Sequence, residues 1–218
     1  VLGWFFRPET PWIAVAALML LMSLIAGIAA VRRVKWRYTG LWLNSIVAVL
    51  TSSWLVTTVA LTVVISPSIW TNNPAQYAVP LLGMILGNTM TGVALGLEAL
   101  TGALKRERAA VEAQLLLGRP RAEAFRPQVR RALRAGFTPI INAMAATGVV
   151  ALPGMMTGQI LSGVAPEEAV KYQLLIMFLI GGATGLGVLG AVLGAVRRLS
   201  DDRLRLRLDR LGHARAGA

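Results

Sequence analysis

The sequence predicts an all-α protein, a polytopic bundle of transmembrane helices that also carries a cytoplasmic helical segment. Hydrophobic residues make up 56% of the 218 residues and charged residues only 15%, a composition typical of membrane proteins. Long stretches carry no charge, and most basic residues lie in the segments between them. The chain has no cysteine, which excludes disulfides and thiolate metal sites.

Five segments are long and apolar enough to be expected to cross a membrane. The first, residues 12–31, has 20 uncharged residues, which at about 1.5 Å per residue cover a hydrocarbon core of roughly 30 Å. A basic cluster follows this segment and none precedes it, so we expect a membrane anchor rather than a cleaved signal peptide. The other expected spans are residues 41–66, 79–100, 135–162 and 171–196.

The net charge of +12 is unevenly distributed, and its distribution predicts an orientation. The basic residues form three groups, with four residues in 32–37, nine in 105–134 and seven in 197–215. The connection 66–79 has none, and the turn before the last span carries Glu167 and Glu168. The three groups are therefore expected on one side, which the positive-inside rule makes cytoplasmic, together with the C-terminus. Because topology accounts for the charge, no nucleic-acid partner is expected.

These features divide the chain into four parts. The parts are residues 1–100 with three transmembrane helices, 101–134 as a cytoplasmic coupling segment, 135–196 with two more helices, and 197–218 as a basic cytoplasmic tail. The chain opens without methionine and with apolar residues that resemble the end of an earlier helix. We therefore expect one or two N-terminal helices to be missing from it.

The cytoplasmic segment is predicted to form two helices. Apolar residues recur at a roughly helical period from Leu104, and Gly118 ends the pattern where a C-cap glycine would stand. A second helix is expected over residues 121–134. One interpretation is an amphipathic helix that lies on the anionic inner leaflet. The other is a projection that transmits force, because Glu112-Ala113 followed by Gly118 resembles the "EAA…G" loop of importer-type ABC permeases, whose short helix sits in a groove of the ATPase subunit.

The stretch "VVALPGMMTGQILSG", residues 149–163, interrupts the fourth expected span. Pro153 lacks a backbone donor and clashes with the preceding turn, so the helix must kink or break near Ala151. Broken helices at membrane depth are tolerated where they are buried in protein or line a cavity, which predicts a gate or pathway here with a close backbone approach at Gly154. The alternative is that the small residues serve helix packing alone, as we expect for the glycines of the last span. The candidate gate residues are Leu152, Pro153, Gly154, Met155, Met156, Thr157, Gly158 and Gln159.

Residues 138–178 resemble the FetB family of ABC-transporter permeases, which includes bacterial iron exporters and plant aluminium-tolerance permeases. The resemblance is strongest in "LPGMMTG", residues 152–158, and continues through "KYQ", residues 171–173. It extends upstream to "GMILGNTMTG", residues 83–92, and "LLLGRPRAEA", residues 115–124. Glu98 belongs to no motif of the family, and the arginine-rich tail has no counterpart in it.

The resemblance implies a multi-pass permease of the bacterial plasma (inner) membrane that exports iron or a related metal ion. It also implies a partner ABC ATPase that binds ATP and Mg, a second copy of the chain, and surrounding membrane lipid. The residues expected to couple this chain to the ATPase are Arg108, Glu112, Leu115, Leu116 and Gly118.

Cargo contacts are expected from polar and sulfur side chains inside the spans. Methionine sulfur is a soft ligand that suits Cu(I), although most membrane methionines only fill gaps in packing. Ferrous iron would favour harder donors, and Glu98 is the one carboxylate within an expected span, two residues from the end of that span. His213, in the tail, is expected to be solvated. The candidate cargo contacts are Asn88, Met90, Glu98 and Asn142, and no metal ligand set is assigned.

The sequence predicts no enzymatic activity for this chain by itself. The phosphate-binding string GxxxxGK[ST] is absent, so the chain cannot hydrolyse ATP by that route. Two alternatives to an ABC permease stay open, a secondary transporter and a structural membrane subunit without transport activity. A secondary transporter would not need the projection 101–134 and usually shows internal repeats, whereas a structural subunit would not need a broken helix.

Overall fold

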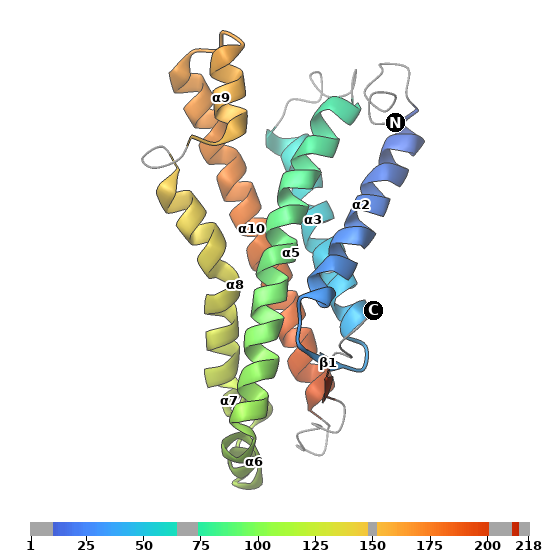
Figure 1. The fold of residues 1–218 in the computed structure, drawn as a ribbon, viewed down its shortest axis with the longest axis vertical. Coiled ribbons are helices and arrows are strands. Elements are labelled where there is room, and N and C mark those ends of the chain that lie inside the picture. Colours follow the sequence, from blue (N-terminus) through green and yellow to red (C-terminus); the bar gives the residue numbers. More distant parts are fainter. Residues whose placement is uncertain (1–10, 65–73, 148–151, 201–210, 214–218) are drawn as a thin grey trace.

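The computed structural model describes residues 11–64, 74–147, 152–200 and 211–213, and within these ranges the chain is almost entirely helical. The helices form an elongated, roughly antiparallel bundle, with a short two-stranded ribbon near one end (Figure 1). The elements are α2 (Trp12–Arg32), β1 (Trp36–Tyr38), α3 (Leu41–Val59), the π-helix η1 (Ala60–Val64), α5 (Pro74–Arg106), α6 (Arg108–Leu116), α7 (Arg121–Ala124), α8 (Arg126–Ala146), α9 (Gly154–Leu161), α10 (Pro166–Leu199) and β2 (Leu211–His213).

Four helices of the described chain are long and apolar enough to cross a membrane. The first two follow the sequence prediction closely, whereas α5 and α10 extend past the predicted bounds at both ends. The spans are Trp12–Arg32, Leu41–Val64, Ala75–Arg106 and Pro166–Leu199. The predicted total of five spans is therefore not confirmed, although the class of fold, a polytopic helical membrane protein, is correct.

The predicted fourth span, residues 135–162, differs from a single helix for a physical reason. Helix α8 begins at Arg126, and its first turns contain four arginines. Its apolar part, residues 135–146, therefore covers only about 18 Å. The helix ends at Ala146, and α9 resumes at Gly154 for eight residues. Helix α8 still runs beside α5 along the bundle and returns the chain to the end that carries α9 (Figure 1).

Helix α5 is central to the packing and contacts α2, α3, α8 and α10. Small residues let these helices approach closely. A Cβ added to Gly136 of α8 would lie 2.6 Å from Val188 Cγ1 of α10, and one added to Gly187 would lie 2.6 Å from Thr89 Cγ2 of α5. Gly194 of α10 similarly has no room for a side chain beside Asn44. The glycines of α10 that line these contacts therefore serve packing, as the sequence indicated.

Apart from Lys171, which pairs with Glu168 near the start of α10, the basic residues of the described chain gather at one end of the bundle, as predicted. The end of α2, strand β1, the end of α5, helices α6 and α7, the start of α8 and the end of α10 all lie there (Figure 1). Glu167 and Glu168 stand in the first turn of α10, at the opposite end. At the basic end β1 pairs with β2 in antiparallel register, with Trp36 opposite His213, so His213 belongs to a strand rather than to an unpaired tail.

Candidate functional sites: a projection at the basic end and an apolar cavity

Helices α6 and α7 form a projection that extends the bundle at its basic end (Figure 1). Helix α5 carries the chain out of the apolar region to Arg106. Glu107 then interrupts the helix with φ −109° and ψ 25°, and α6 starts in a new direction at Arg108. Residues 101–134 therefore hold the end of α5, α6, α7 and the start of α8, where the sequence predicted two helices.

One of the predicted coupling residues, Leu115, does not lie on the face that α6 offers to another molecule. Val111 and Leu115 are buried, at 1% and 6% exposure, within the hydrophobic cluster of this chain. Leu116 and Leu117 are 88% and 81% exposed. Leu115 thus packs α6 against the bundle and is not accessible to a partner. Leu117, which is exposed beside Leu116, becomes a candidate contact residue in its place. Adjacent exposed leucines outside the apolar region are a candidate contact surface for another protein or for a membrane.

Gly118 ends α6 as the sequence predicted. It has φ +78°, a left-handed conformation that glycine adopts without strain. The Gly118 N–H donates to Leu115 O at 3.0 Å and the Arg119 N–H donates to Gln114 O at 3.2 Å, the paired bonds of a Schellman cap. This cap fixes the turn just after Leu116 and Leu117. Arg108 and Glu112, the other two coupling candidates, form an exposed i,i+4 ion pair at 2.8 Å.

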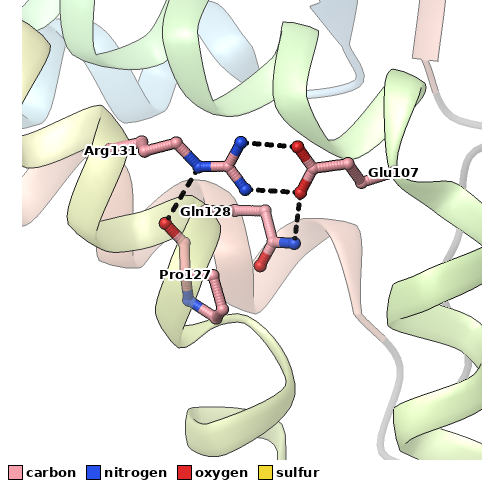
Figure 2. Close-up of polar contacts among 4 residues, drawn as sticks. All are labelled: Glu107, Pro127, Gln128 and Arg131. Atoms are coloured by element: carbon pink, nitrogen blue, oxygen red, sulfur yellow. Dashed lines mark hydrogen bonds and ion pairs between the residues drawn. The ribbon is translucent and has the colours of Figure 1, made fainter.

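A polar contact between Glu107 and α8 fixes the base of the projection, and it was not predicted from the sequence. The Glu107 carboxylate accepts two hydrogen bonds from the Arg131 guanidinium, one on each oxygen, and a third from Gln128 Nε2 at 3.0 Å (Figure 2). Arg131 Nε also faces Pro127 O at 3.4 Å. Because the carboxylate sits at the joint between α5 and α6, the bidentate pair holds the direction of α6 relative to α8. No local pattern in the sequence relates residues 24 positions apart, so only the fold reveals the pair.

The pair makes the projection sensitive to acid. The hydrogen bonds from Arg131 hold the pKa of Glu107 below its ordinary value, and the carboxylate holds the pKa of Arg131 above its own. A lowered carboxylate pKa contributes stability above the ordinary pKa of glutamate, and that contribution is lost as the pH falls through the lowered value. We expect Arg131→Gln to return the pKa of Glu107 toward its ordinary value, as measured by NMR titration of ¹³C-labelled glutamate. The exposed Arg108→Gln, which breaks only a surface pair, should leave that pKa unchanged.

The break predicted in the fourth span lies between α8 and α9. Ala151, the predicted position, falls outside the described residues, but the helices on either side end at Ala146 and begin at Gly154. Pro153 stands just before α9 in an extended conformation, φ −62° and ψ 142°, and its carbonyl accepts the Thr157 Oγ1 hydrogen bond at 3.2 Å. Leu152 is exposed. Among the described residues the chain is therefore non-helical at Thr147 and again at Leu152 and Pro153, on either side of the predicted position.

Within this chain the close backbone approach predicted at Gly154 is absent. A Cβ at Gly154 or Gly158 would meet no atom of the described chain within 4 Å, whereas Gly136 and Gly187 have no such room. The two glycines of α9 are thus not required by the packing of this chain. Met156 is the buried anchor of α9, at 3% exposure.

Helix α9 and the first half of α10 border a partly open cavity of about 500 Å³ beside α5. Two predicted gate residues, Met155 and Gln159, line it together with Met84 of α5. Gln159 Oε1 is buried and accepts no hydrogen bond from the described residues, and the same holds for Oε1 of Gln173 on α10. Gln173 does not line the cavity, whereas the unpaired Gln159 oxygen lies in its wall and is a hard donor that suits a cation or a bound water. The remaining lining residues are Gln76, Tyr77, Pro80, Leu81, Tyr172, Leu175, Ile176 and Leu179.

The four residues expected to contact cargo are not brought together. Asn88 lies one turn along α5 from Met84 and donates to its carbonyl at 2.9 Å, while Met90 packs against the core. Asn142 is exposed on α8. Glu98 is well inside α5, because the helix continues past the predicted end, and it accepts the Lys35 backbone N–H at 2.6 Å. Glu98 thus ties α5 to the connection after α2.

No group of three or more His, Cys, Asp or Glu side chains that could hold a metal ion occurs among the described residues. The side chains at the cavity that could donate to an ion are instead thioethers, amides and the phenol groups of Tyr77 and Tyr172.

The fold and these sites define a class of protein, a polytopic α-helical membrane protein with a polar projection at its basic end. The chain belongs to the uncharacterised protein family UPF0014, whose match covers residues 1–200. No solved structure gives a significant match to the chain.

Three relatives illustrate the family. The chain is 37% identical to the UPF0014 membrane protein slr1647 of Synechocystis, over 83% of this chain and 70% of the relative. It is 36% identical to the protein Aluminum Sensitive 3 of Arabidopsis thaliana, over 50% of this chain and 40% of the relative. It is 31% identical to the probable iron export permease protein FetB of Escherichia coli, over 59% of this chain and 49% of the relative. The matched region thus spans less than half of the latter two relatives.

Proposed function

We propose that this chain is the permease subunit of an ABC transporter that exports iron or a related metal ion. ATP and Mg bind to a separate ATPase subunit, two copies of the permease form the pathway, and the assembly lies in a bacterial plasma membrane with the basic end and the C-terminus in the cytoplasm. The relative FetB, named a probable iron export permease, supports the class of cargo. The charge distribution supports the orientation.

The observation that carries the proposal is the pair of exposed leucines on a braced projection. Leu116 and Leu117 stand at the tip of α6, between a Schellman cap and the core contact of Leu115. The Glu107–Arg131 pair fixes the other end of α6 to α8. A projection that receives the motion of an ATPase must not bend under load, and these three contacts resist bending. Helix α8 leads directly from the projection toward α9 and the cavity.

The cavity between α5, α9 and α10 supplies the proposed route for cargo. Met84, Met155 and Gln159 offer two soft sulfurs and one hard oxygen, so the donors present favour no single metal strongly. A transport site must also release its ion, which suits weak neutral donors better than a cage of carboxylates. In the proposed transport cycle this wall moves relative to α8, since α8 ends at Ala146 and α9 begins separately at Gly154.

Co-purification and ATP hydrolysis test the proposal. We expect an affinity-tagged chain to capture an ABC ATPase from native membranes, and ferrous iron to stimulate ATP hydrolysis by the complex reconstituted in nanodiscs. A secondary transporter would move the ion without capturing an ATPase. A structural subunit would capture it but show no stimulation by any metal ion, and either result would contradict the proposal.

A further inference from the structure

One outer face of α8 combines three arginines with an apolar groove, and neither feature is used by the proposed transport mechanism. The groove is a shallow, open hollow along one face of α8, since all its lining residues belong to that helix, and it begins at the basic end. Its basic end is lined by three arginines, Arg126, Arg130 and Arg134. Its apolar end is lined by Leu133, Phe137 and Ile141. A second hollow, bounded by Arg126, Pro127 and Arg130, adjoins it.

The three arginines are not neutralised by the described part of the chain. All three are exposed, and none forms an ion pair with a described carboxylate. The nearby Glu107 is already engaged by Arg131 on another side of α8. The spacing of four residues stacks the guanidinium groups one above another along the helix, which concentrates positive charge in one line.

The chemistry of the groove changes along its length. Arg134 is the last charge on α8 before the apolar residues 135–146. Residues 126–141 extend about 22 Å at 1.5 Å per residue, similar to one leaflet of a bilayer with its headgroups. Ile141, at the apolar end, is 56% exposed. The groove therefore runs from three guanidinium groups at one end to an apolar surface at the other, over a length that matches one leaflet.

We propose that this groove binds one anionic phospholipid of the leaflet at the basic end. The arginines hold the phosphate groups by charge-assisted hydrogen bonds, and one acyl chain lies along Leu133, Phe137 and Ile141. The uncompensated charge selects an anionic headgroup over a zwitterionic one. A bound lipid at this position would brace the start of α8 next to the Glu107–Arg131 pair. The site depends on membrane insertion of the chain and not on the proposed ATPase partner.

Lipid retention by the purified chain without any ATPase tests this site. The chain is loaded with equal amounts of phosphatidylglycerol and phosphatidylcholine, washed with detergent, and its bound lipid is counted by native mass spectrometry. We expect retention of phosphatidylglycerol, and a loss of at least roughly tenfold in the triple variant Arg126→Gln, Arg130→Gln and Arg134→Gln. The control triple variant Arg32→Gln, Arg33→Gln and Arg119→Gln removes the same charge from exposed positions at the same end and should retain the lipid.

The apolar end of the groove has its own test. Ile141→Ser removes apolar contact without a change of charge and should lower retention severalfold, whereas Leu186→Ser, at an exposed position of α10, should not. Helix content by circular dichroism shows that each variant is folded. If the triple groove variant is not produced, the single variants Arg130→Gln and Arg134→Gln are compared with Arg32→Gln.

Several results would overturn the site. Equal losses in the groove and control variants would show a diffuse effect of surface charge. Equal retention of phosphatidylcholine would remove the selectivity, and displacement of the lipid by inorganic phosphate alone would show an anion site without an acyl-chain contact. Unchanged lipid retention, with capture of the ATPase lost in the groove variant, would assign the groove to a protein contact instead.

Discussion

Replacing both Leu116 and Leu117 with aspartate is expected to abolish capture of the ATPase subunit while leaving this chain folded. Both leucines are more than 80% exposed, so the substitutions bury no charge within the chain. In the proposed complex they are the apolar anchors of the projection, and loss of a central anchor typically costs about 2 kcal/mol or more of binding free energy. Two lost anchors would therefore weaken capture by well over tenfold. The measurement is pull-down of the ATPase by the tagged variant, with thermal unfolding in detergent followed alongside.

Leu115→Asp provides the matched control. Leu115 is 6% exposed inside the cluster of this chain, so a buried aspartate would lower the free energy of unfolding by several kcal/mol and reduce the yield of folded chain. The two variants place charge at neighbouring positions but should fail in different ways. Unchanged pull-down by the Leu116 and Leu117 variant would remove these residues from the contact and with them the main support for the projection as a coupling element.

The sequence predicted where α6 ends but not that Leu115 is buried while Leu116 is exposed. The run "LLLG" placed three leucines before a cap glycine, and the cap was correctly predicted because a left-handed glycine has a local signature. Which of the three leucines faces the core depends on the direction of α6 after Glu107. That direction is fixed by Arg131, 24 residues away, a contact between different elements that no periodicity records.

For the spans too, features set by local sequence were predicted, whereas features that depend on contacts between distant elements were not. The boundaries of α2 follow from an uninterrupted apolar run, and the structure ends this helix within one residue of the prediction. The gathering of basic residues at one end was also predicted, because charge position and topology are linked. The segment 135–162 was counted as one span because hydropathy averages over a break, although Pro153 marked the place where helix α9 starts. The cavity joins α5, α9 and α10 and was beyond sequence analysis, which identified only its α9 wall as a possible pathway.

Replacing Pro153 with alanine is expected to reduce metal export per folded transporter by at least roughly tenfold, without loss of assembly. Proline disfavours a helix interior by about 3 kcal/mol, so the alanine variant would favour a continuous helix through the break between α8 and α9. If transport requires two arrangements of this wall, a bias of about 1.4 kcal/mol already changes their ratio tenfold. The measurement is efflux from proteoliposomes, normalised to folded transporter.

Two glycine variants separate a moving gate from simple packing. A side chain at Gly154 meets nothing within 4 Å, so Gly154→Leu should change the free energy of unfolding by less than about 0.5 kcal/mol. A Cβ added to Gly187 would instead lie 2.6 Å from Thr89 Cγ2, so Gly187→Leu should cost about 3 kcal/mol and reduce the yield of folded chain. The gate hypothesis expects Gly154→Leu to lower export from intact transporters, because the leucine would obstruct the movement of α9 or its contact with a second copy. Full efflux per molecule in both Pro153→Ala and Gly154→Leu would show that the break between α8 and α9 has no part in the transport cycle.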